Sequence, residues 1–363
     1  MIIDVVVGAR PNFMKAAALF AVLSKFPRIK LRLIHTGQHY DFNMSRVFLK
    51  ELHLPKPLRN LGVGSGTHAT QTAAIMKKYE NWIQDNSPDL CLVVGDVNST
   101  VACAIVCAKK DVPVGHIEAG LRSFDRAMPE EINRILTDSI SSFFFTTEFS
   151  AVKNLRKEGH SRSNIYLVGN TMIDTLMRMK SSAMSMGAHR KFSLPYKGYA
   201  YLTLHRPSNV DNFKVLQKVC ENIIWLSKRM PIIFAIHPRT QKMILGSSIS
   251  RKMKLTDRIH LTPPLGYLES LSILLNSKVV ITDSGGIQEE TSALQIPCLT
   301  LRENTERPIT VELGTNTLIK NNWNLFRSCI QKIEKGTYRK GHRKIPFWDG
   351  KTGERILKIC QKL

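Results

Sequence analysis

The chain has 363 residues, enough for about two domains of ordinary size. Lys and Arg outnumber Asp and Glu by 52 to 29, which gives a formal charge of +23. The composition, 43% hydrophobic and 22% charged, is that of a globular protein and excludes a disordered, collagen-like or coiled-coil chain. No apolar run approaches the roughly 18 residues that a membrane span needs, so no insertion into a membrane is expected.

The first half of the chain alternates short apolar runs with longer stretches of helical period, which is typical of parallel βαβ construction. The predicted strands are IIDVVVG, KLRLIHTG, LCLVVGD, PVGHIEAG, SFFFTTE and NIYLVGN. The predicted helices are residues 11–26, 68–86, 100–110, 131–140 and 150–157. The N-terminal residues lack a basic region and a cleavage site, so the first run is expected to stay in the mature protein as a strand.

The same pattern restarts in the second half of the chain. Its predicted strands are YAYLTLH, PIIFAIH, IHLTPP, KVVITD, PCLTL and NTLI, and its predicted helices are residues 214–228, 267–276 and 287–295. A predicted helix at 171–186 and a basic loop separate the two halves, which places the boundary near residues 169 and 170. We therefore expect an α/β protein with doubly wound parallel-sheet domains at 1–169 and 170–350, and a closing helix at 351–363 that packs against one of them.

The seven cysteines include no C-x-x-C pair and lie mostly inside apolar runs such as DLCLVV. This pattern is typical of small core residues in a reducing compartment, and it favours a cytoplasmic protein. Cys and His do not cluster at the spacing of a zinc site, so no metal is expected.

The positive charge is concentrated near the end of the chain, where the last 44 residues hold 12 basic and 3 acidic residues. No zinc finger, helix-turn-helix or aromatic RNA-binding motif accompanies this charge. A solvated basic surface that attracts an anionic substrate or a membrane surface is therefore favoured, and a nucleic-acid patch is the alternative.

Polar residues follow almost every predicted strand. In parallel sheets, ligands bind beyond the carboxyl ends of the strands, so these residues are the candidates for a site. The carboxylates are Asp96, Glu118, Glu130 and Glu131; the cations are Arg10, Lys15 and Arg302; and the imidazoles are His205 and His237. Because both halves present such groups, we expect one cleft between two facing domains.

The segment Ser284-Gly285-Gly286 lies between a predicted strand and a predicted helix. Such a turn directs the backbone N–H groups of the helix N-terminus at an anion. A diphosphate suits this electropositive end of the helix. The alternative is that the glycines only permit a tight turn from strand to helix. Glu289 and Glu290 follow, where a carboxylate can accept hydrogen bonds from ribose hydroxyls. No G-x-G-x-x-G or P-loop motif is present, which argues against a nicotinamide cofactor.

Arg10, Lys15 and Arg302 stand at strand ends or in first helical turns, where the helix dipole does not favour a cation. Solvation at the surface can explain any one of these cations. The occurrence of all three at such positions is better explained by an acidic ligand. If the carboxylates converge with His205, repulsion and burial would raise at least one carboxyl pKa and equip the site for proton transfer. Glu130 is equally explained by the helix start after Pro129, and His237 by a structural hydrogen bond.

Eight blocks of the sequence carry a family resemblance. They are, in order, GARPNFMK, TGQHYD, GDVNST, HIEAGLRSFDRAMPEEINR, GNTMIDT, HRPSN, TDSGGIQEE and RENTERP. With these blocks the chain resembles the non-hydrolysing UDP-N-acetylglucosamine (UDP-GlcNAc) 2-epimerases over nearly its whole length. The resemblance implies a glycosyltransferase-B-like fold of two Rossmann-like domains facing a cleft, a homodimer without metal or cofactor, and interconversion of UDP-GlcNAc and UDP-ManNAc.

The resemblance also implies a route, in which elimination of UDP gives 2-acetamidoglucal and UDP then adds back with inverted C2. The residues that match the family's catalytic positions are Asp96, Glu118, Glu131 and His205. The residues that match its substrate-binding positions are Arg10, Lys15, Ser284, Gly285, Gly286, Glu290 and Arg302, with Glu290 on the ribose. Which carboxylate removes the C2 proton is not assigned by the resemblance.

The sequence departs from the family pattern in two places. Residues 267–270 read YLES, without the aromatic residue that stacks on uracil in some members. Residues 38–42 read QHYDF, whereas members that are activated by a second UDP-GlcNAc have a Q-H-x-x-M segment. Base stacking must therefore come from elsewhere in the chain or be absent, and the second departure argues against activation.

Three other functions compete with this interpretation. A 2-epimerase of a related UDP-sugar, such as a diacetamido-uronic acid, would suit the basic surplus. A sugar transferase of the same fold would not explain the three carboxylates together. A nucleic-acid binder is motivated by charge alone and lacks a readout motif.

Overall fold

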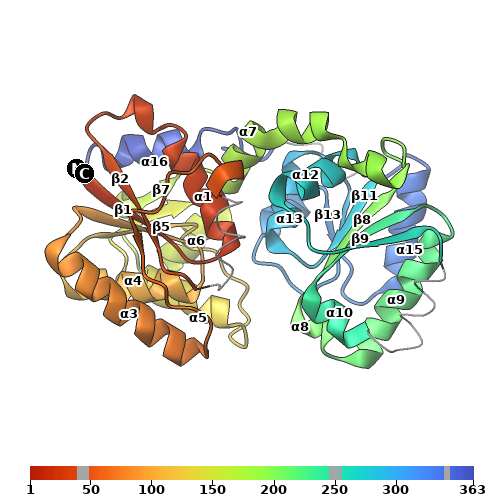
Figure 1. The fold of residues 1–363 in the computed structure, drawn as a ribbon, viewed down its shortest axis with the longest axis horizontal. Coiled ribbons are helices and arrows are strands. Elements are labelled where there is room, and N and C mark those ends of the chain that lie inside the picture. Colours follow the sequence, from red (N-terminus) through yellow and green to blue (C-terminus); the bar gives the residue numbers. More distant parts are fainter. Residues whose placement is uncertain (39–48, 245–252, 254–255, 339–343) are drawn as a thin grey trace. The chain divides into compact units, whose positions relative to one another are not determined.

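The computed structural model describes residues 1–38, 49–244, 253, 256–338 and 344–363. Contacts divide the chain into two units: Met1–Arg178 with Pro346–Leu363 form unit 1, and Met179–Ile345 form unit 2. Each unit is an α/β domain around one parallel sheet (Figure 1). The expected boundary at residues 169 and 170 lies just before helix α7 (Thr171–Met186), whereas the division between the units falls within that helix.

The sheet of unit 1 has the strand order β3-β2-β1-β4-β5-β6-β7, and every neighbouring pair is parallel. Its strands are β1 (Ile2–Val7), β2 (Lys30–His35), β3 (Arg59–Asn60), β4 (Leu90–Val94), β5 (Val114–Ile117), β6 (Phe143–Thr146) and β7 (Ile165–Leu167). The direction in which the strands are added reverses between β1 and β4, and this position is called the switch point of the sheet. In parallel sheets, ligands bind at the switch point, beyond the carboxyl ends of the strands. Strand β3 was not predicted, because two exposed polar residues carry no pattern.

Helices cover both faces of this sheet (Figure 1). They are α1 (Arg10–Phe20), α3 (His68–Asp85), α4 (Asn98–Lys109), α5 (Pro129–Ile140), α6 (Phe149–Lys157), α7 and α16 (Thr352–Cys360), with short 3-10 turns at Leu23–Lys25 and Arg162–Asn164. The chain returns from unit 2 to place α16 against α1. There a Cβ on Gly353 would come within 2.3 Å of the carbonyl oxygen of Ala18, and the Gly353 N–H donates to Asp174 at 2.8 Å.

The sheet of unit 2 repeats the topology, with the parallel order β10-β9-β8-β11-β12-β13. Its strands are β8 (Ala200–Leu204), β9 (Ile232–Ile236), β10 (Ile259–Thr262), β11 (Val279–Thr282), β12 (Cys298–Thr300) and β13 (Asn316–Leu318). Its order reverses between β8 and β11, so this unit has a second switch point. Two Rossmann-like domains are therefore confirmed.

The described helices of unit 2 are η3 (Ala188–Phe192), α8 (Pro207–Val210), α9 (Phe213–Ser227), α10 (Pro238–Ile244), α12 (Tyr267–Asn276), α13 (Gly285–Ala293), α14 (Pro308–Glu312) and α15 (Trp323–Glu334). Of these, α9, α12 and α13 were predicted from the sequence, and the others were not. Helix α15 lies in the basic stretch that was interpreted only as charge. Its buried Phe326, Ile330 and Ile333 recur at helical spacing, which is the signal that predicts it.

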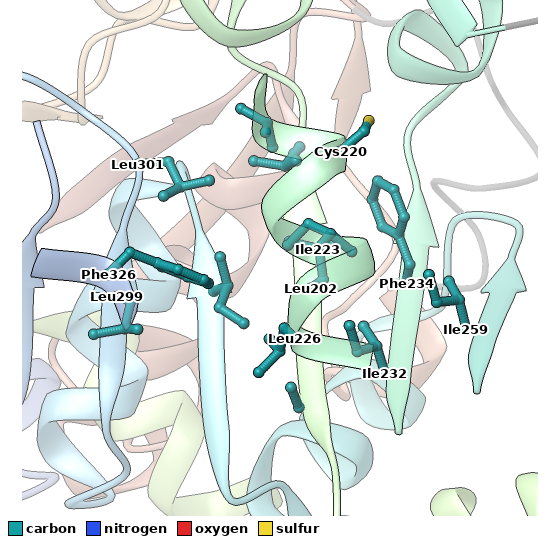
Figure 2. Close-up of a cluster of buried hydrophobic side chains, with 14 of the residues drawn as sticks. Leu202, Cys220, Ile223, Leu226, Ile232, Phe234, Ile259, Leu299, Leu301 and Phe326 are labelled. Atoms are coloured by element: carbon teal, nitrogen blue, oxygen red, sulfur yellow. The ribbon is translucent and has the colours of Figure 1, made fainter. Parts of the chain in front are cut away.

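The core of unit 2 shows why strands of both sheets read as continuous apolar runs. On one face, Leu202 of β8 packs with Ile223 of α9 and Phe326 of α15 (Figure 2). On the other face, the adjacent Tyr201 packs in a cluster that includes Ile273 of α12. Successive side chains point to opposite faces, and both faces are buried, so no polar alternation is possible.

All seven cysteines are buried thiols, as small core residues would be. Burial raises the pKa of Cys298 to about 11 and that of Cys360 to about 12, which keeps both thiols protonated at neutral pH. Within the described part of the chain, no helix combines the length and apolarity that crossing a membrane would need.

Candidate functional site

The predicted site residues of unit 1 lie beside its switch point. Arg10 begins α1 directly after β1, Asp96 follows β4, and Glu118 follows β5. Lys15 is carried by α1, and Glu131 stands in the first turn of α5. The topology therefore brings the carboxylates and cations that the sequence singled out to one edge of one sheet.

Lys15 and Glu118 form a buried ion pair at this edge. The distance between Lys15 Nζ and Glu118 Oε2 is 2.6 Å, and the side chains are 9% and 2% exposed. Glu118 has a φ of +73°, a left-handed conformation that is uncommon for a residue with a side chain. The adjacent loop passes so close that a Cβ on Gly95 would lie 3.2 Å from Lys15 Nζ. The pair thus occupies a tightly enclosed position.

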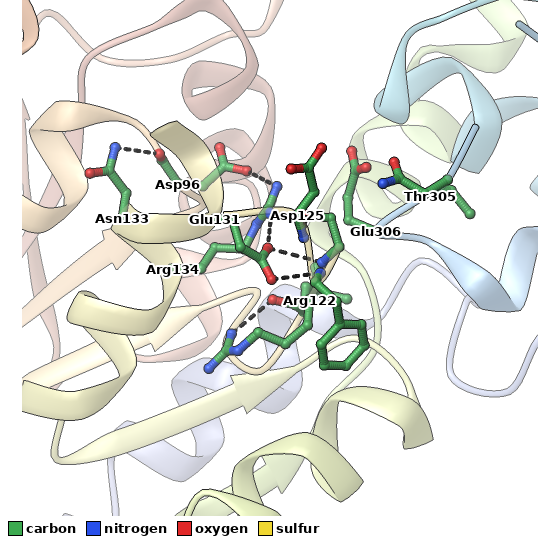
Figure 3. A network of polar contacts seen from close by, with 12 residues as sticks. Asp96, Arg122, Asp125, Glu131, Asn133, Arg134, Thr305 and Glu306 are labelled. Atoms are coloured by element: carbon green, nitrogen blue, oxygen red, sulfur yellow. Dashed lines mark hydrogen bonds and ion pairs between the residues drawn. The ribbon is translucent and has the colours of Figure 1, made fainter. Parts of the chain in front are cut away.

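Arg134 joins the other two carboxylates, as Figure 3 shows. Its Nη2 lies 2.6 Å from Asp96 Oδ2, and its Nη1 lies 2.6 Å from Glu131 Oε2. Glu131 also accepts hydrogen bonds from the backbone N–H groups of Ser123 and Phe124, both at 2.9 Å. Glu131 is fully buried in these contacts, whereas the Asp96 side chain is 25% exposed. Each carboxylate therefore has a cationic partner, and the expected mutual repulsion is neutralised.

A buried histidine supports the loop that carries Asp96. His116 Nε2 lies 2.8 Å from the carbonyl oxygen of Gly95, and its Nδ1 lies 2.6 Å from Asp138 Oδ1. Asp138 also pairs with Arg122 at 2.7 Å. Burial raises the Asp138 pKa, but His116 and Arg122 outweigh it, and the pKa lies below its ordinary value. The sequence analysis did not predict this network.

In unit 2 the predicted residues again follow the strands at the switch point. His205 follows β8, Ser284 follows β11 as the N-cap of α13, and Arg302 follows β12. A Cβ on Gly285 would lie 2.6 Å from Glu306 Oε1, so a side chain at this position would displace the Glu306 carboxylate. The start of α13 therefore presents backbone N–H groups beside a buried carboxylate.

Three arginines and two glutamates surround this helix start. Arg302 Nη1 lies 2.7 Å from Glu306 Oε2, and Arg206 Nη2 lies 3.7 Å from Glu306 Oε1. Arg307 Nε pairs with Glu289 Oε1 at 2.5 Å. Burial lowers the Arg302 pKa, and the nearby Arg206 adds to this, while Glu306 opposes it. Both Lys15 and Arg302, which were expected to indicate an acidic ligand, thus have carboxylate partners within the protein.

His205 is held by an aspartate that the sequence analysis did not single out. His205 Nδ1 lies 2.9 Å from Asp283 Oδ1, and the histidine side chain is 40% exposed. Burial raises the pKa of the fully buried Asp283, but His205 and other hydrogen-bond donors outweigh it, so the pKa lies below its ordinary value. The His237 ring centroid is 5.7 Å from that of His205.

The remaining candidates differ in burial. Glu290 is buried in α13, whereas Ser284 and Gly286 are half-buried and His237 is exposed. Tyr267, the first residue of α12, is buried. Of the segment compared with Q-H-x-x-M, only Gln38 is described, and residues 39–42 lie outside the described residues. Within the described ranges, no three His, Cys, Asp or Glu residues gather in a way that could hold a metal ion.

Comparisons with known proteins agree with this arrangement. The sequence profile of the family described as UDP-N-acetylglucosamine 2-epimerase matches residues 21–361. A protein of that name from Methanocaldococcus jannaschii is 42% identical over 364 residues, which cover 99% of this chain and 98% of the relative. A UDP-2,3-diacetamido-2,3-dideoxy-D-glucuronate 2-epimerase from Pseudomonas aeruginosa is 37% identical over 318 residues, or 86% of this chain and 87% of the relative.

A solved structure extends the likeness to three dimensions. The crystal structure of the M. jannaschii UDP-GlcNAc 2-epimerase, in complex with UDP-GlcNAc and UDP, matches with a TM-score of 0.90 and 42% identity and covers the whole of both chains. The strand order, the residues at the two switch points and this full-length similarity together show that the chain belongs to the UDP-N-acetylglucosamine 2-epimerase family.

Proposed function

We propose that this protein catalyses the reversible epimerisation of UDP-GlcNAc to UDP-ManNAc at C2. The observation that carries the proposal is the 42% identity over 99% of the chain to the M. jannaschii protein of that name. The carboxylates and the imidazole at the ends of the strands support it, because they supply groups for proton transfer without a cofactor.

The chemistry explains why several groups are needed. The C2 hydrogen is not next to a carbonyl, so its direct removal would leave an unstabilised carbanion. In the proposed route a base takes the C2 proton while the C1–O bond to UDP breaks. The C–H electron pair forms the C1–C2 double bond of 2-acetamidoglucal, and the C–O pair leaves with UDP. UDP then adds back to C1 as an acid protonates the opposite face of C2.

The contacts in unit 1 divide the proposed roles of the carboxylates. Glu131 is occupied by two backbone N–H groups and Arg134, which supports a positioning role for it. Asp96 is the more exposed partner of Arg134, and Glu118 is paired with the Lys15 ammonium. We therefore propose that Asp96 and Glu118 exchange protons with the two faces of C2.

The contacts in unit 2 favour a role in holding the nucleotide. A diphosphate suits the start of α13 at Ser284, Gly285 and Gly286, where N–H groups and the nearby Arg302 stabilise negative charge. Arg10 and Lys15 remain proposed substrate-binding groups of unit 1. Glu290 is proposed to accept the ribose hydroxyls, and the exposed His205 to act at the leaving group.

Incubation with UDP-GlcNAc in deuterated water, without metal or acceptor, tests the proposal. NMR is expected to show deuterium at C2 and a mixture of UDP-GlcNAc and UDP-ManNAc. Free ManNAc with UDP as the main product would show a hydrolysing enzyme instead. An unchanged substrate would contradict the proposal, provided that UDP still protects the protein against thermal unfolding.

A second substrate is supported by the P. aeruginosa relative, which is named for a diacetamido-glucuronate, and by the net charge of +23. Comparing kcat/KM for the two UDP-sugars distinguishes the candidates. We expect UDP-GlcNAc to be the better substrate, and the reverse ranking would assign the protein to the uronic acid.

We further propose that the chain acts as a homodimer in the cytoplasm and does not bind nucleic acid. Light scattering after size exclusion should give twice the mass of the chain. A gel shift that persists at moderate salt would contradict the last expectation, because nonspecific phosphate binding weakens steeply with salt.

A further inference from the structure

The strongest unassigned feature is the environment of Asp283, the residue after β11. Its carboxylate is fully buried and lies at hydrogen-bond distance from four donors. Besides His205 Nδ1 at 2.9 Å, these are the backbone N–H groups of His205 at 3.1 Å and Arg206 at 2.9 Å, and Asn209 Nδ2 at 3.0 Å. Such a set of donors stabilises the ionised carboxylate, and it fixes the position of both oxygens.

An ionised carboxylate can only accept hydrogen bonds, so it determines which nitrogen of His205 carries a proton. The proton must lie on Nδ1, toward Asp283. The other ring nitrogen, Nε2, is then left to exchange a proton or donate to a ligand from a side chain that is 40% exposed. The contact of Nδ1 holds the ring against Asp283, and the backbone N–H of His205 helps to fix the carboxylate that the ring meets.

The other charged groups near this pair leave that assignment in place. His237 Nδ1 accepts the backbone N–H of Arg239 at 3.2 Å, so this second ring does not compete for Asp283 through that nitrogen. Partial burial lowers the pKa of His237, and His205 and Arg239 lower it further, although Asp283 acts in the opposite direction. Arg206 and Arg302 are turned toward Glu306, with which both pair.

We propose that Asp283 is a positioning residue that holds His205 in the Nδ1-protonated form with Nε2 directed away from the protein interior. The catalytic part of this inference rests on the proposed function. The tautomer does not, because it follows from the contacts of unit 2 alone. Asp283 would thus act through His205 and would touch no reacting atom.

The tautomer is measured directly by ¹⁵N NMR of the wild-type protein at a pH where the ring is neutral, with His205→Asn used to assign the signals. We expect a protonated Nδ1 and an unprotonated Nε2. The opposite pattern would overturn the proposal whether or not the protein epimerises any sugar, because the tautomer is read from the wild-type spectrum and does not depend on turnover.

Asp283→Asn tests the consequence for catalysis. An amide presents donors as well as an acceptor, so it favours the wrong tautomer, and kcat should fall by about 10²- to 10⁴-fold. KM should change little, because Asp283 is not proposed to contact the substrate. The His205 ¹⁵N signals should shift toward the Nε2-protonated form.

Thr203→Val is the matched control. It removes the hydrogen bond between the hydroxyl groups of Thr203 and Thr282, whose oxygens are 2.7 Å apart and join strands β8 and β11. The contact between Asp283 and His205 stays in place. The control variant should lower Tm comparably while keeping kcat and the His205 signals unchanged. If both variants lost kcat equally, or if Asp283→Asn retained it, the positioning role would be wrong. If the wild type itself turned over no UDP-sugar, only the proposed function would fail.

Discussion

The two units build their candidate sites on the same topology, but they place different groups at the switch point and expose them to different degrees. In unit 1, the carboxylates at the switch point are paired with protein cations, and Glu118 and Lys15 are almost fully buried. In unit 2, the switch point presents a helix start, arginines and an imidazole that is 40% exposed. One scaffold thus holds an enclosed carboxylate–ammonium pair in one copy and a partly exposed imidazole in the other.

This difference has a consequence for stability. A buried ion pair costs desolvation energy, and removing one partner leaves an uncompensated charge in the interior. The groups of unit 1 should therefore be tied to folding as well as to catalysis, whereas His205 should affect catalysis alone. Substitutions in the two units can separate these effects.

The largest effect is expected from Glu118→Gln. It removes a proposed proton-transfer group, so kcat should fall by about 10³-fold or more. It also leaves the Lys15 ammonium buried without Glu118, at a cost of about 3–5 kcal/mol in the free energy of unfolding. The double variant Lys15→Met, Glu118→Gln should recover stability but not activity. A stable, active single variant would refute the contrast between the units.

His205→Asn should lower kcat by about 10²- to 10³-fold with no resolvable change in Tm. The side chain is partly exposed, and Asp283 keeps its backbone donors and Asn209. Calorimetry beside steady-state kinetics checks both points. A large drop in Tm would mean that the imidazole of unit 2 is as structural as the carboxylates of unit 1.

Gly285→Ala should mainly weaken nucleotide binding. Its Cβ would displace Glu306, which in turn holds Arg302, so the Kd for UDP should rise by roughly tenfold. Gly66→Ala is the control, because its Cβ would meet neighbours only at 3.8 Å or beyond. Calorimetric titration with UDP compares the two, and equal Kd values would remove the helix start from the binding site.

The smallest effect is expected on the free energy of unfolding when the pH is lowered. The Asp138 pKa in the folded protein lies below the ordinary 3.8, so its stabilising contribution is complete above that pH and is lost as the pH falls through the lowered pKa. The unfolding free energies of wild type and Asp138→Asn should therefore differ by a constant amount from pH 7 to pH 5 and converge below pH 3.8. Urea titrations across this range measure the difference.

Much of the fold was predictable because both sheets are covered on both faces. Their strands, such as Leu90–Val94, are uninterrupted apolar runs, and the polar residues that follow them stand out. Strand β3 could not be predicted in this way, because it is short and exposed. Helix α15 was missed because the basic residues on its solvent side drew attention to the charge of this stretch and not to its apolar spacing.

The pairing of charges was not predictable. Lys15 and Glu118 are 103 residues apart, and His205 and Asp283 are 78 apart, so nothing local links them. The sequence indicated which charged groups stand at strand ends, but it did not show that protein partners already neutralise them. Pairing depends on which strands become neighbours, and that is a property of the assembled sheet.

The return of the chain to unit 1 has a consequence for how the protein is made. Residues 346–363 complete unit 1 through the contact of α16 with α1, yet they are synthesised after all of unit 2. Unit 2 is one continuous stretch and can finish folding while unit 1, although begun first, still lacks a helix. On the ribosome, the half with the enclosed carboxylates is therefore the last to close, and a nascent chain cut short before residue 346 would leave α1 uncovered.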